Sequence, residues 1–322
     1  MSYPPGDAAP AQHTPASHAL GIDVGGTKIA AGVVALDTGQ VLRRRLIPTD
    51  AERGGEAILA DALDLTHSLL GDAQSLGIEP AAVGVGVAEL VDAAGEIHSA
   101  HSLGWRGMPV RERFSAILPT VVESDVRAAA LAEARFGAGR GCRLFAFVTV
   151  GTGISSSLVQ DGLPIIGARG NALVLGTMPL STICSECGAA LRPVLEEIAS
   201  GPALAARYRA KGGNARRGED VLASAAKGDT RAKEVVRIAG QALGSSVAFL
   251  VNVTDPEAVV VGGGLGSAGG HLWESFVPAC RAHIYADATR LLPILQAALG
   301  PDAGLIGAAA ASSRALATEG GQ

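Results

Sequence analysis

Gly-Ile-Asp-Val-Gly-Gly-Thr-Lys, residues 21–28, is the stretch of this sequence that decides the fold. One apolar run leads into it and another, residues 29–34, follows it, so the pattern predicts a strand, a tight glycine turn and a second strand. Two adjacent glycines permit positive φ and let a ligand approach the backbone closely. Amide groups exposed in such a turn bind anions, and an acidic residue just ahead suits a divalent cation, directly or through water. The stretch therefore indicates a phosphate–Mg²⁺ site, with an ordinary β-hairpin as the alternative. Its candidate residues are Asp23, Gly25, Gly26, Thr27 and Lys28.

The same arrangement recurs further along the chain. The apolar run 145–150 ends in Gly-Thr-Gly, and a short strand, 154–160, follows. A third apolar run, 258–261, ends in three consecutive glycines. Three glycine turns at strand ends fit two phosphate-binding hairpins and one turn on the adenosine side of a nucleotide. Their residues are Gly151, Thr152 and Gly153 in the second turn and Gly262, Gly263 and Gly264 in the third.

The composition is that of a soluble enzyme. At 322 residues the chain holds two domains of ordinary size, and 48% hydrophobic residues support a large core. The net charge of −5 argues against nucleic acid as the main partner. No apolar run approaches the length of a membrane span, and residues 1–18 lack the order of a signal peptide and predict a disordered tail. Four cysteines do not make a disulfide scaffold, so a cytoplasmic protein without a membrane partner is expected.

Hydrophobic periodicity predicts alternating strands and helices, and hence an α/β fold. A meander of strands over 19–47 is followed by a helix over 55–76 and a buried strand over 83–87. Later in the chain, one helix is expected over 193–210. The last helix, 304–317, is rich in small residues and is expected to pack back on the first domain.

Glu123-Ser124-Asp125 lies between the first two turns, where a predicted strand ends and a helix begins. In isolation, Asp125 is best explained as a helix N-cap. Phosphoryl transfer to an alcohol, however, needs a carboxylate that accepts the hydroxyl proton in line with the γ-phosphate. A kinase therefore has a specific use for Asp125 as the catalytic base.

Several motifs follow one another in a recognisable order. They are G-I-D-V-G-G-T-K at 21–28, S-L-G-W at 102–105, E-S-D-V-R-A-A-A at 123–130, G-T-G-I at 151–154, A-S-G-P at 199–202, N-V-T-D-P at 252–256, V-V-G-G-G-L at 260–265 and G-L-I-G-A-A at 304–309. With these motifs the chain resembles the ROK family of sugar kinases and related repressors, over residues 20–317.

The resemblance implies a two-lobed actin-like (ribonuclease H-like) ATPase fold with an active-site cleft between the lobes. Residues 19–125, completed by the helix 304–317, would form the N-terminal lobe, and residues 126–303 the C-terminal lobe. ATP and a sugar would meet in the cleft. Asp125 matches the family's catalytic aspartate, and Asp23 lies where Mg²⁺ is organised. The first two turns match the phosphate loops.

Departures from the family pattern concern the acceptor side. Ala-Glu-Leu stands at 88–90 where the family carries Pro-Gly-Pro, and Ser124 replaces an asparagine that binds sugar. Residues 172–177 align with a sugar-binding stretch of the family, which we name the acceptor stretch. Val174 falls at its sugar-binding glutamate, and Thr177 falls at a histidine that contacts both sugar and zinc. Glu196 is retained at a position that contacts sugar, although an acid in the first turn of a helix would explain it as well.

The zinc site of the family is incomplete in this sequence. Cys184 and Cys187 keep metal-ligand spacing, but the family's histidine and one of its cysteines are missing. A tetrahedral Zn²⁺ needs four ligands. We therefore expect no structural zinc.

An intact nucleotide side with a rewritten acceptor side predicts an ATP- and Mg²⁺-dependent kinase with an unusual acceptor. A C7 cyclitol of the 2-epi-5-epi-valiolone type, phosphorylated at its 7-hydroxyl, is the specific expectation, because it needs fewer of the lost contacts. A kanosamine, aminosugar or hexose 6-kinase and a catalytically inactive sugar-sensing protein are the alternatives. A repressor is disfavoured, because about 18 residues ahead of the first strand are too few for a helix-turn-helix. A homodimer is expected.

Overall fold

A mixed five-stranded sheet of order β3-β2-β1-β4-β5 is built from the first part of the chain. The structure is a computed structural model that describes residues 17–183 and 186–313. The first three strands are antiparallel, whereas β4 and β5 run parallel to β1. The strands are β1 (His18–Val24), β2 (Lys28–Ala35), β3 (Val41–Pro48), β4 (Val83–Val87) and β5 (Thr120–Ser124).

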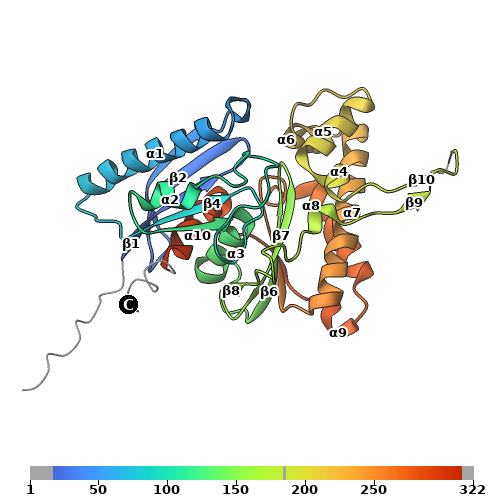
Figure 1. Ribbon diagram of the computed structural model, residues 1–322. Helices are drawn as coiled ribbons and strands as arrows, with labels where there is room; N and C mark the ends of the chain where they lie inside the picture. Colours follow the sequence, from blue (N-terminus) through green and yellow to red (C-terminus); the bar gives the residue numbers. More distant parts are fainter. Residues whose placement is uncertain (1–16, 184–185, 314–322) are drawn as a thin grey trace, which may run out of the picture.

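A second five-stranded sheet, of order β12-β11-β6-β7-β8, repeats this plan. Three antiparallel strands are again followed by two parallel ones, since β11 pairs parallel with both β6 and β12. Between the two parts of this sheet, the chain forms a short two-stranded ribbon, β9–β10, that projects from the molecule (Figure 1). The strands are β6 (Leu144–Val150), β7 (Ile154–Gln160), β8 (Leu163–Pro164), β9 (Thr182–Ile183), β10 (Ala190–Leu191), β11 (Ala258–Gly262) and β12 (Ile294–Gln296).

Helices cover both sheets, as the predicted α/β fold requires (Figure 1). The α-helices are α1 (Gly55–Ser75), α2 (Val110–Ser115), α3 (Asp125–Phe136), α4 (Glu196–Ala199), α5 (Gly201–Ala210), α6 (Gly218–Ala226), α7 (Thr230–Thr254), α8 (Gly270–His283), α9 (Asp287–Arg290) and α10 (Ala303–Ala311). Three short 3₁₀ turns are η1 (Ala51–Arg53), η2 (Leu175–Thr177) and η3 (Gly300–Asp302).

The Val-Gly-Val-Gly-Val pattern of β4 reflects two different neighbours. Successive side chains of a strand point to opposite faces. The valines, with Leu20 and Ile22 of β1, pack in the core beneath α1. On the other face α10 lies so close that a Cβ at Gly84 would overlap the carbonyl group of Ala308, and a Cβ at Gly21 would overlap that of Leu305. Helix α10 therefore packs directly on the backbone of β1 and β4, and α3 packs on α10 and on β7 of the second sheet.

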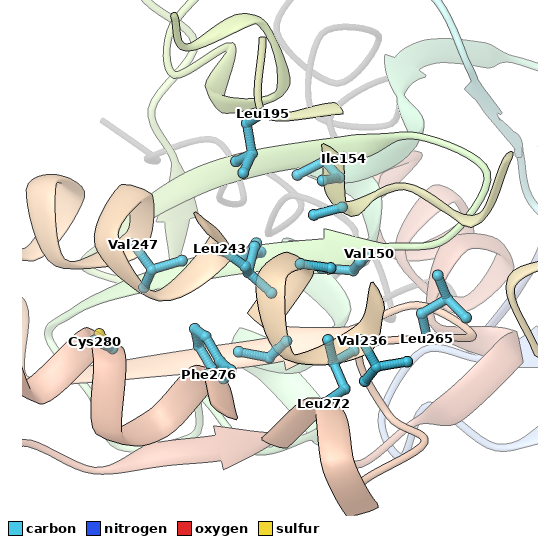
Figure 2. Packing of buried hydrophobic residues seen from close by; sticks show 14 of the residues in the cluster. Val150, Ile154, Leu195, Val236, Leu243, Val247, Leu265, Leu272, Phe276 and Cys280 are labelled. Carbon is cyan, nitrogen blue, oxygen red and sulfur yellow. The ribbon is translucent and has the colours of Figure 1, made fainter. Parts of the chain in front are cut away.

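The core of the second half lies between the second sheet and helices α4 to α8. Val150 and Ile154 of the sheet meet Leu243 of α7 and Phe276 of α8 there (Figure 2). By length and composition α7 could cross a membrane, contrary to the sequence expectation that no apolar run is long enough. However, 61% of its apolar window is buried inside the protein. That burial is typical of a core helix.

The predicted helix over 193–210 is in fact two helices, α4 and α5, separated at Ser200. The Ser200 side chain caps α5 by accepting a hydrogen bond from the amide of Ala203, and Pro202 occupies the first turn. Proline in a first turn is favourable, because its missing N–H would have no helical partner there. Residues 1–16 of the predicted tail and 314–317 of the predicted last helix lie outside the described residues.

Candidate active site

The register of the first sheet brings the early motifs to one edge. Val24 of β1 pairs with Val87 of β4, and Val87 pairs with Ser124 of β5. The carboxyl ends of these three parallel strands therefore lie side by side. Asp23 and Asp125 consequently meet at this edge, which is where ligands bind in open α/β sheets.

Asp23 lies on the face of β1 that packs against α10. A Cβ at Gly304, in the first turn of α10, would overlap its carboxylate, and the absence of a side chain at Gly86 leaves it further space. Burial first, and then the charge of Asp125, raise the pKa of Asp23 to about 7, against the lowering effect of Lys28. A proton or a cation is therefore favoured at this carboxylate.

Asp125 is the first residue of α3. Its Oδ1 accepts a hydrogen bond of 2.6 Å from the amide of Val126. Burial is the largest cause that raises its pKa to about 6, and the charge of Glu89 adds to it, whereas the Val126 amide and the Ser124 hydroxyl lower it. Asp125 is therefore a carboxylate that changes protonation close to neutral pH, as a general base does.

The first glycine turn is closed by a hydrogen bond of 3.0 Å from the amide of Gly25 to the carbonyl of Lys28. The hydroxyl of Thr49, which follows β3, donates a hydrogen bond to the carbonyl of Gly25 and so stabilises the turn. The positive φ expected at Gly25 and Gly26 does not occur at these two described residues. Space favours glycine at Gly25, where a Cβ would lie 3.3 Å from the Lys28 carbonyl oxygen, whereas a Cβ at Gly26 would make an ordinary contact of 3.6 Å with the Cβ of Ser102. Residues Gly26 to Lys28 are exposed.

The second and third glycine turns lie together at the carboxyl end of the second sheet. The amide of Gly151 donates to the carbonyl of Gly153 at 2.9 Å. A Cβ on Gly151 would lie 3.9 Å from the amide nitrogen of Gly264. Gly263 has φ of 82°, and a Cβ there would overlap the carbonyl oxygen of Val150. Glycine is therefore required at Gly263 both by φ and by space.

Glu196 supports the second turn. Its Oε2 accepts a hydrogen bond of 2.7 Å from the amide of Ile154. The same oxygen lies 2.9 Å from where a Cβ of Gly153 would be and 3.2 Å from that of Gly176. This contact joins the second turn to the predicted acceptor stretch.

The predicted acceptor stretch 172–177 ends in the turn η2. Val174 is 44% exposed, and the hydroxyl of Thr177 donates to its carbonyl at 3.0 Å. Leu173 has φ of 64°, a left-handed conformation that a leucine rarely adopts. Its carbonyl accepts a hydrogen bond of 2.6 Å from the Ser156 hydroxyl, which helps to hold that conformation. The stretch therefore presents an apolar side chain where the sequence alignment expected an acid.

Arg127 connects the loop just ahead of residues 172–177 to the first half of the chain. The guanidinium is buried and paired with Glu123 at 2.6 Å. It also donates to the carbonyls of Val91, at 2.6 Å, and Gly170, at 2.8 Å. A buried charge with several acceptors holds its neighbours in fixed positions. Arg127 thus links the base of α3 to the loops that follow β4 and β8.

The chain matches the ROK family over residues 19–315. It belongs to the ROK family. This ROK chain has the two-sheet, actin-like ATPase fold of its structural relatives.

Relatives of this ROK chain are similar over nearly its whole length. A glucokinase of Streptomyces coelicolor is 31% identical over 312 residues, covering 90% of this chain and 96% of the relative. An N-acetylmannosamine kinase of Escherichia coli is 33% identical over 298 residues, covering 90% and 96%. The structure of a ROK glucokinase from Streptomyces griseus in complex with glucose and AMPPNP is 30% identical, with a TM-score of 0.77 and coverage of 91% and 98%.

The zinc prediction for this ROK chain is not tested by the structure. Cys184 lies outside the described residues, and Cys187 is exposed. Within residues 17–183 and 186–313, no group of three or more His, Cys, Asp and Glu side chains could hold a metal ion. The expectation that the ROK chain lacks structural zinc stays a prediction.

Sequence reasoning missed four contributors to the ROK site. Glu89 was noted as a departure without a role, and Arg127 was quoted within a motif without one. Gly304 was likewise quoted within a motif without a role, and Thr49 carried no local signal, because its partner Gly25 is distant in the sequence. Glu89 and Arg127 could have been found because each is a charged residue within an otherwise apolar stretch of sequence.

A separate hollow of about 620 Å³ lies beside the outer edge of β5. Residues 92–95, Arg111 and Ile166 line it together with the strand itself. It contains none of the predicted site residues. The predicted site instead combines glycine turns with the partly buried carboxylates Asp23 and Asp125 at the carboxyl ends of the strands.

Proposed function

We propose that this ROK protein is a kinase that transfers the γ-phosphoryl group of ATP to the primary hydroxyl of a sugar-like acceptor, with Asp125 as the catalytic base. The observation that carries the proposal is the position of Asp125. It begins α3 at the sheet edge shared with Asp23 and the first turn, and its pKa is raised to about 6. A base with such a pKa is ionised at neutral pH yet basic enough to accept a proton.

The proposed transfer uses the residues of the edge in separate roles. The acceptor oxygen attacks the γ-phosphorus, the bond to the β-phosphate oxygen breaks with its electron pair leaving on ADP, and the hydroxyl proton passes to Asp125. Backbone amides of the first and second turns, with Lys28, are proposed to bind the phosphates. The third turn, which lies beside the second, is proposed to flank the adenosine.

Mg²⁺ fits the charges at this edge. Asp23 and Asp125 are two carboxylates that repel one another. Mg²⁺ binds oxygen ligands and usually takes only one or two carboxylates from the protein. Asp23 would hold the ion, directly or through water. When bound, the ion neutralises charge on the phosphate oxygens.

The proposed acceptor is a C7 cyclitol with a hydroxymethyl group rather than glucose. Val174 puts an exposed apolar side chain where a sugar-binding acid would be expected, and the Thr177 hydroxyl donates its hydrogen bond to the Val174 carbonyl. Each hexose hydroxyl left unpaired there would cost about 1–3 kcal/mol. The second candidate is a hexose or aminosugar 6-kinase, favoured by the glucokinase and N-acetylmannosamine kinase relatives. We further propose that the lobes are residues 19–125, completed by the helix predicted over 304–317, and residues 126–303.

An acceptor screen tests this function. ADP release and ³¹P spectra would be measured with ATP, Mg²⁺ and glucose, N-acetylmannosamine, kanosamine or a hydroxymethyl C7 cyclitol. Transfer to the cyclitol is expected to exceed transfer to glucose by about tenfold or more in kcat/KM, the equivalent of one unpaired hydroxyl. Glucose as the best acceptor would overturn the cyclitol proposal and leave the kinase standing. No transfer to any acceptor would favour the inactive sensor.

Restoring the family's acceptor residues should change the choice of acceptor. The double variant Val174→Glu with Thr177→His is expected to weaken use of the cyclitol and improve use of hexoses, because a carboxylate penalises an acceptor that has no hydroxyl to offer it. The KM for ATP should change little. Steady-state kinetics with both acceptors, at varied ATP, measures the three quantities.

An unchanged ratio of acceptor kcat/KM values in a folded double variant would show that residues 174–177 do not face the acceptor. Arg169→Lys, on the same loop but with an exposed side chain, is the matched control and should leave the ratio unchanged.

A further inference from the structure

Glu89 is a buried acid immediately beyond β4 whose hydrogen bonds all go to one loop. Only 6% of the residue is exposed. Its Oε2 accepts from the Ser99 hydroxyl and, at 2.9 Å, from the amide of His101. Its Oε1 accepts from the amides of Ser102 at 2.8 Å and Leu103 at 2.7 Å. One carboxylate thus organises residues 99–103, which we name the 99–103 loop.

Those bonds keep Glu89 charged. Burial alone would raise its pKa, but the Ser99 hydroxyl and the three loop amides outweigh burial, so the pKa is lowered. Buried carboxylates are tolerated when several donors replace water. The loop is therefore built around a negative charge that a neutral side chain would not reproduce.

The 99–103 loop is placed against the first phosphate turn. The Cβ of Ser102 lies 3.6 Å, and its Oγ 4.0 Å, from where a Cβ of Gly26 would be. Beyond the loop, the indole N–H of Trp105 donates to the carbonyl of Gly55 at 2.9 Å, which fixes the other end to α1. Ser102 is partly exposed between these two anchors. The loop therefore presents one hydroxyl beside the turn.

Glu89 also lies at the same sheet edge as Asp125. The two residues follow paired strands, β4 and β5, at the same edge, and the charge of Glu89 acts on Asp125. Glu89 therefore lies near the base, while the 99–103 loop that it holds contacts the first phosphate turn at Gly26. The acceptor hydroxyl must occupy that region if Asp125 takes its proton and the phosphate comes from the turn.

We propose that Glu89 is a positioning residue for phosphoryl transfer, which holds the 99–103 loop so that the Ser102 hydroxyl contacts the acceptor at the first phosphate turn. This proposal rests on the proposed kinase function. It assigns a role to a residue of this chain that stands where Pro-Gly-Pro occurs in the family pattern. The ligand contacted by Ser102 is a polyhydroxylated acceptor with a primary alcohol.

The test compares Glu89→Gln with Glu133→Gln. Glu133 is fully buried and likewise accepts hydrogen bonds from backbone amides, those of Ala138, Ala298 and Leu299, but far from the edge. Both variants should lose thermal stability. Only Glu89→Gln should lower kcat/KM for the acceptor, by about 10²-fold for a displaced contact, while the affinity for AMPPNP stays within about threefold. Glu89→Asp, which keeps the charge, should restore part of the loss.

Glucose and the hydroxymethyl cyclitol are the acceptor probes, with calorimetry for AMPPNP binding. Ser102→Ala removes the hydroxyl and keeps the hydrogen bond from the amide of residue 102 to Glu89, so it tests the proposal even if Glu89→Gln does not fold. It should raise the acceptor KM and leave the melting temperature unchanged. A Glu89→Gln enzyme with the kinetics of Glu133→Gln, or a Ser102→Ala enzyme with an unchanged acceptor KM, would overturn the role of Glu89. A wild-type protein that phosphorylates neither acceptor would overturn the kinase function instead.

Discussion

Asp125→Asn is expected to lower kcat by about 10²–10⁴-fold, the usual contribution of a general base, while nucleotide binding is retained. The same variant is expected to melt at a higher temperature than the wild type at pH 8. Both effects follow from a partly buried carboxylate whose charge the fold disfavours. Coupled ADP release measures the first effect, and thermal melts at several pH values, without nucleotide or Mg²⁺, measure the second.

The sign of the stability effect follows from the pKa. Folding raises the pKa of Asp125 from 3.8 to about 6, so the folded state binds the proton more tightly than the unfolded state does. Stability attributable to this group is therefore present below pH 4 and is lost as the pH rises to about 6. Asparagine has no charge to bury, so its advantage should be full above about pH 6 and should fade towards pH 4. Asp23, whose pKa Asp125 raises, should gain from the change as well.

Asp229 provides the matched control. It caps α7 by accepting hydrogen bonds from the amides of Arg231 and Ala232, and the Arg231 and Tyr208 side chains hold its pKa well below the usual value. Asp229→Asn should therefore lose stability at neutral pH and keep full activity. If Asp125→Asn instead behaved like Asp229→Asn, Asp125 would be a helix-capping residue and the proposed mechanism would lose its base.

Gly84→Ala is expected to destabilise the protein by about 3 kcal/mol, the upper end of the usual cost of overpacking. Its Cβ would overlap the carbonyl group and amide region of Ala308–Ala309, which are backbone atoms held by the rest of α10. Relief would require α10 to move away from β4, and with it the contact of Gly304 with Asp23. Urea unfolding followed by circular dichroism measures the change.

Gly71→Ala is the control for this substitution. Gly71 lies inside α1, and a Cβ there would have no atom within 4 Å, so alanine should stabilise the helix by about 0.5–1 kcal/mol. Opposite signs for the two substitutions are expected. Equal effects would mean that the approach of α10 to β4 is looser than the structure describes.

The sequence predicted the local elements of both halves because their signals are local. The three glycine turns, the antiparallel hairpins and the strand-to-helix junction at Asp125 each depend on neighbours within a few residues. The short strand β12 and the helices α2 and α9 were not predicted, because each is too short to establish a period. The break at Ser200 was missed because the apolar pattern on either side of it is helical.

The physical reason for some correct predictions differs from the one that the sequence suggested. Gly25 and Gly26 were attributed to positive φ, but neither residue adopts it, and only at Gly25 would a Cβ come close to another atom, the Lys28 carbonyl oxygen at 3.3 Å. At Gly263 both reasons apply. A glycine in a sequence therefore does not by itself say whether φ or space favours it; the three-dimensional neighbours decide that.

The sequence by itself determined the α/β class, the order of the motifs and the candidate base, Asp125, since these depend on residue type and spacing. Tertiary structure alone decided which of them meet. The alignment of β1, β4 and β5 brings Asp23 to Asp125, and Glu89 shapes a loop 10 to 14 residues away. Arg127 joins loops 36 and 43 residues distant. Hydrogen bonds between such distant partners leave no periodic trace in the sequence, because either partner alone is compatible with many folds.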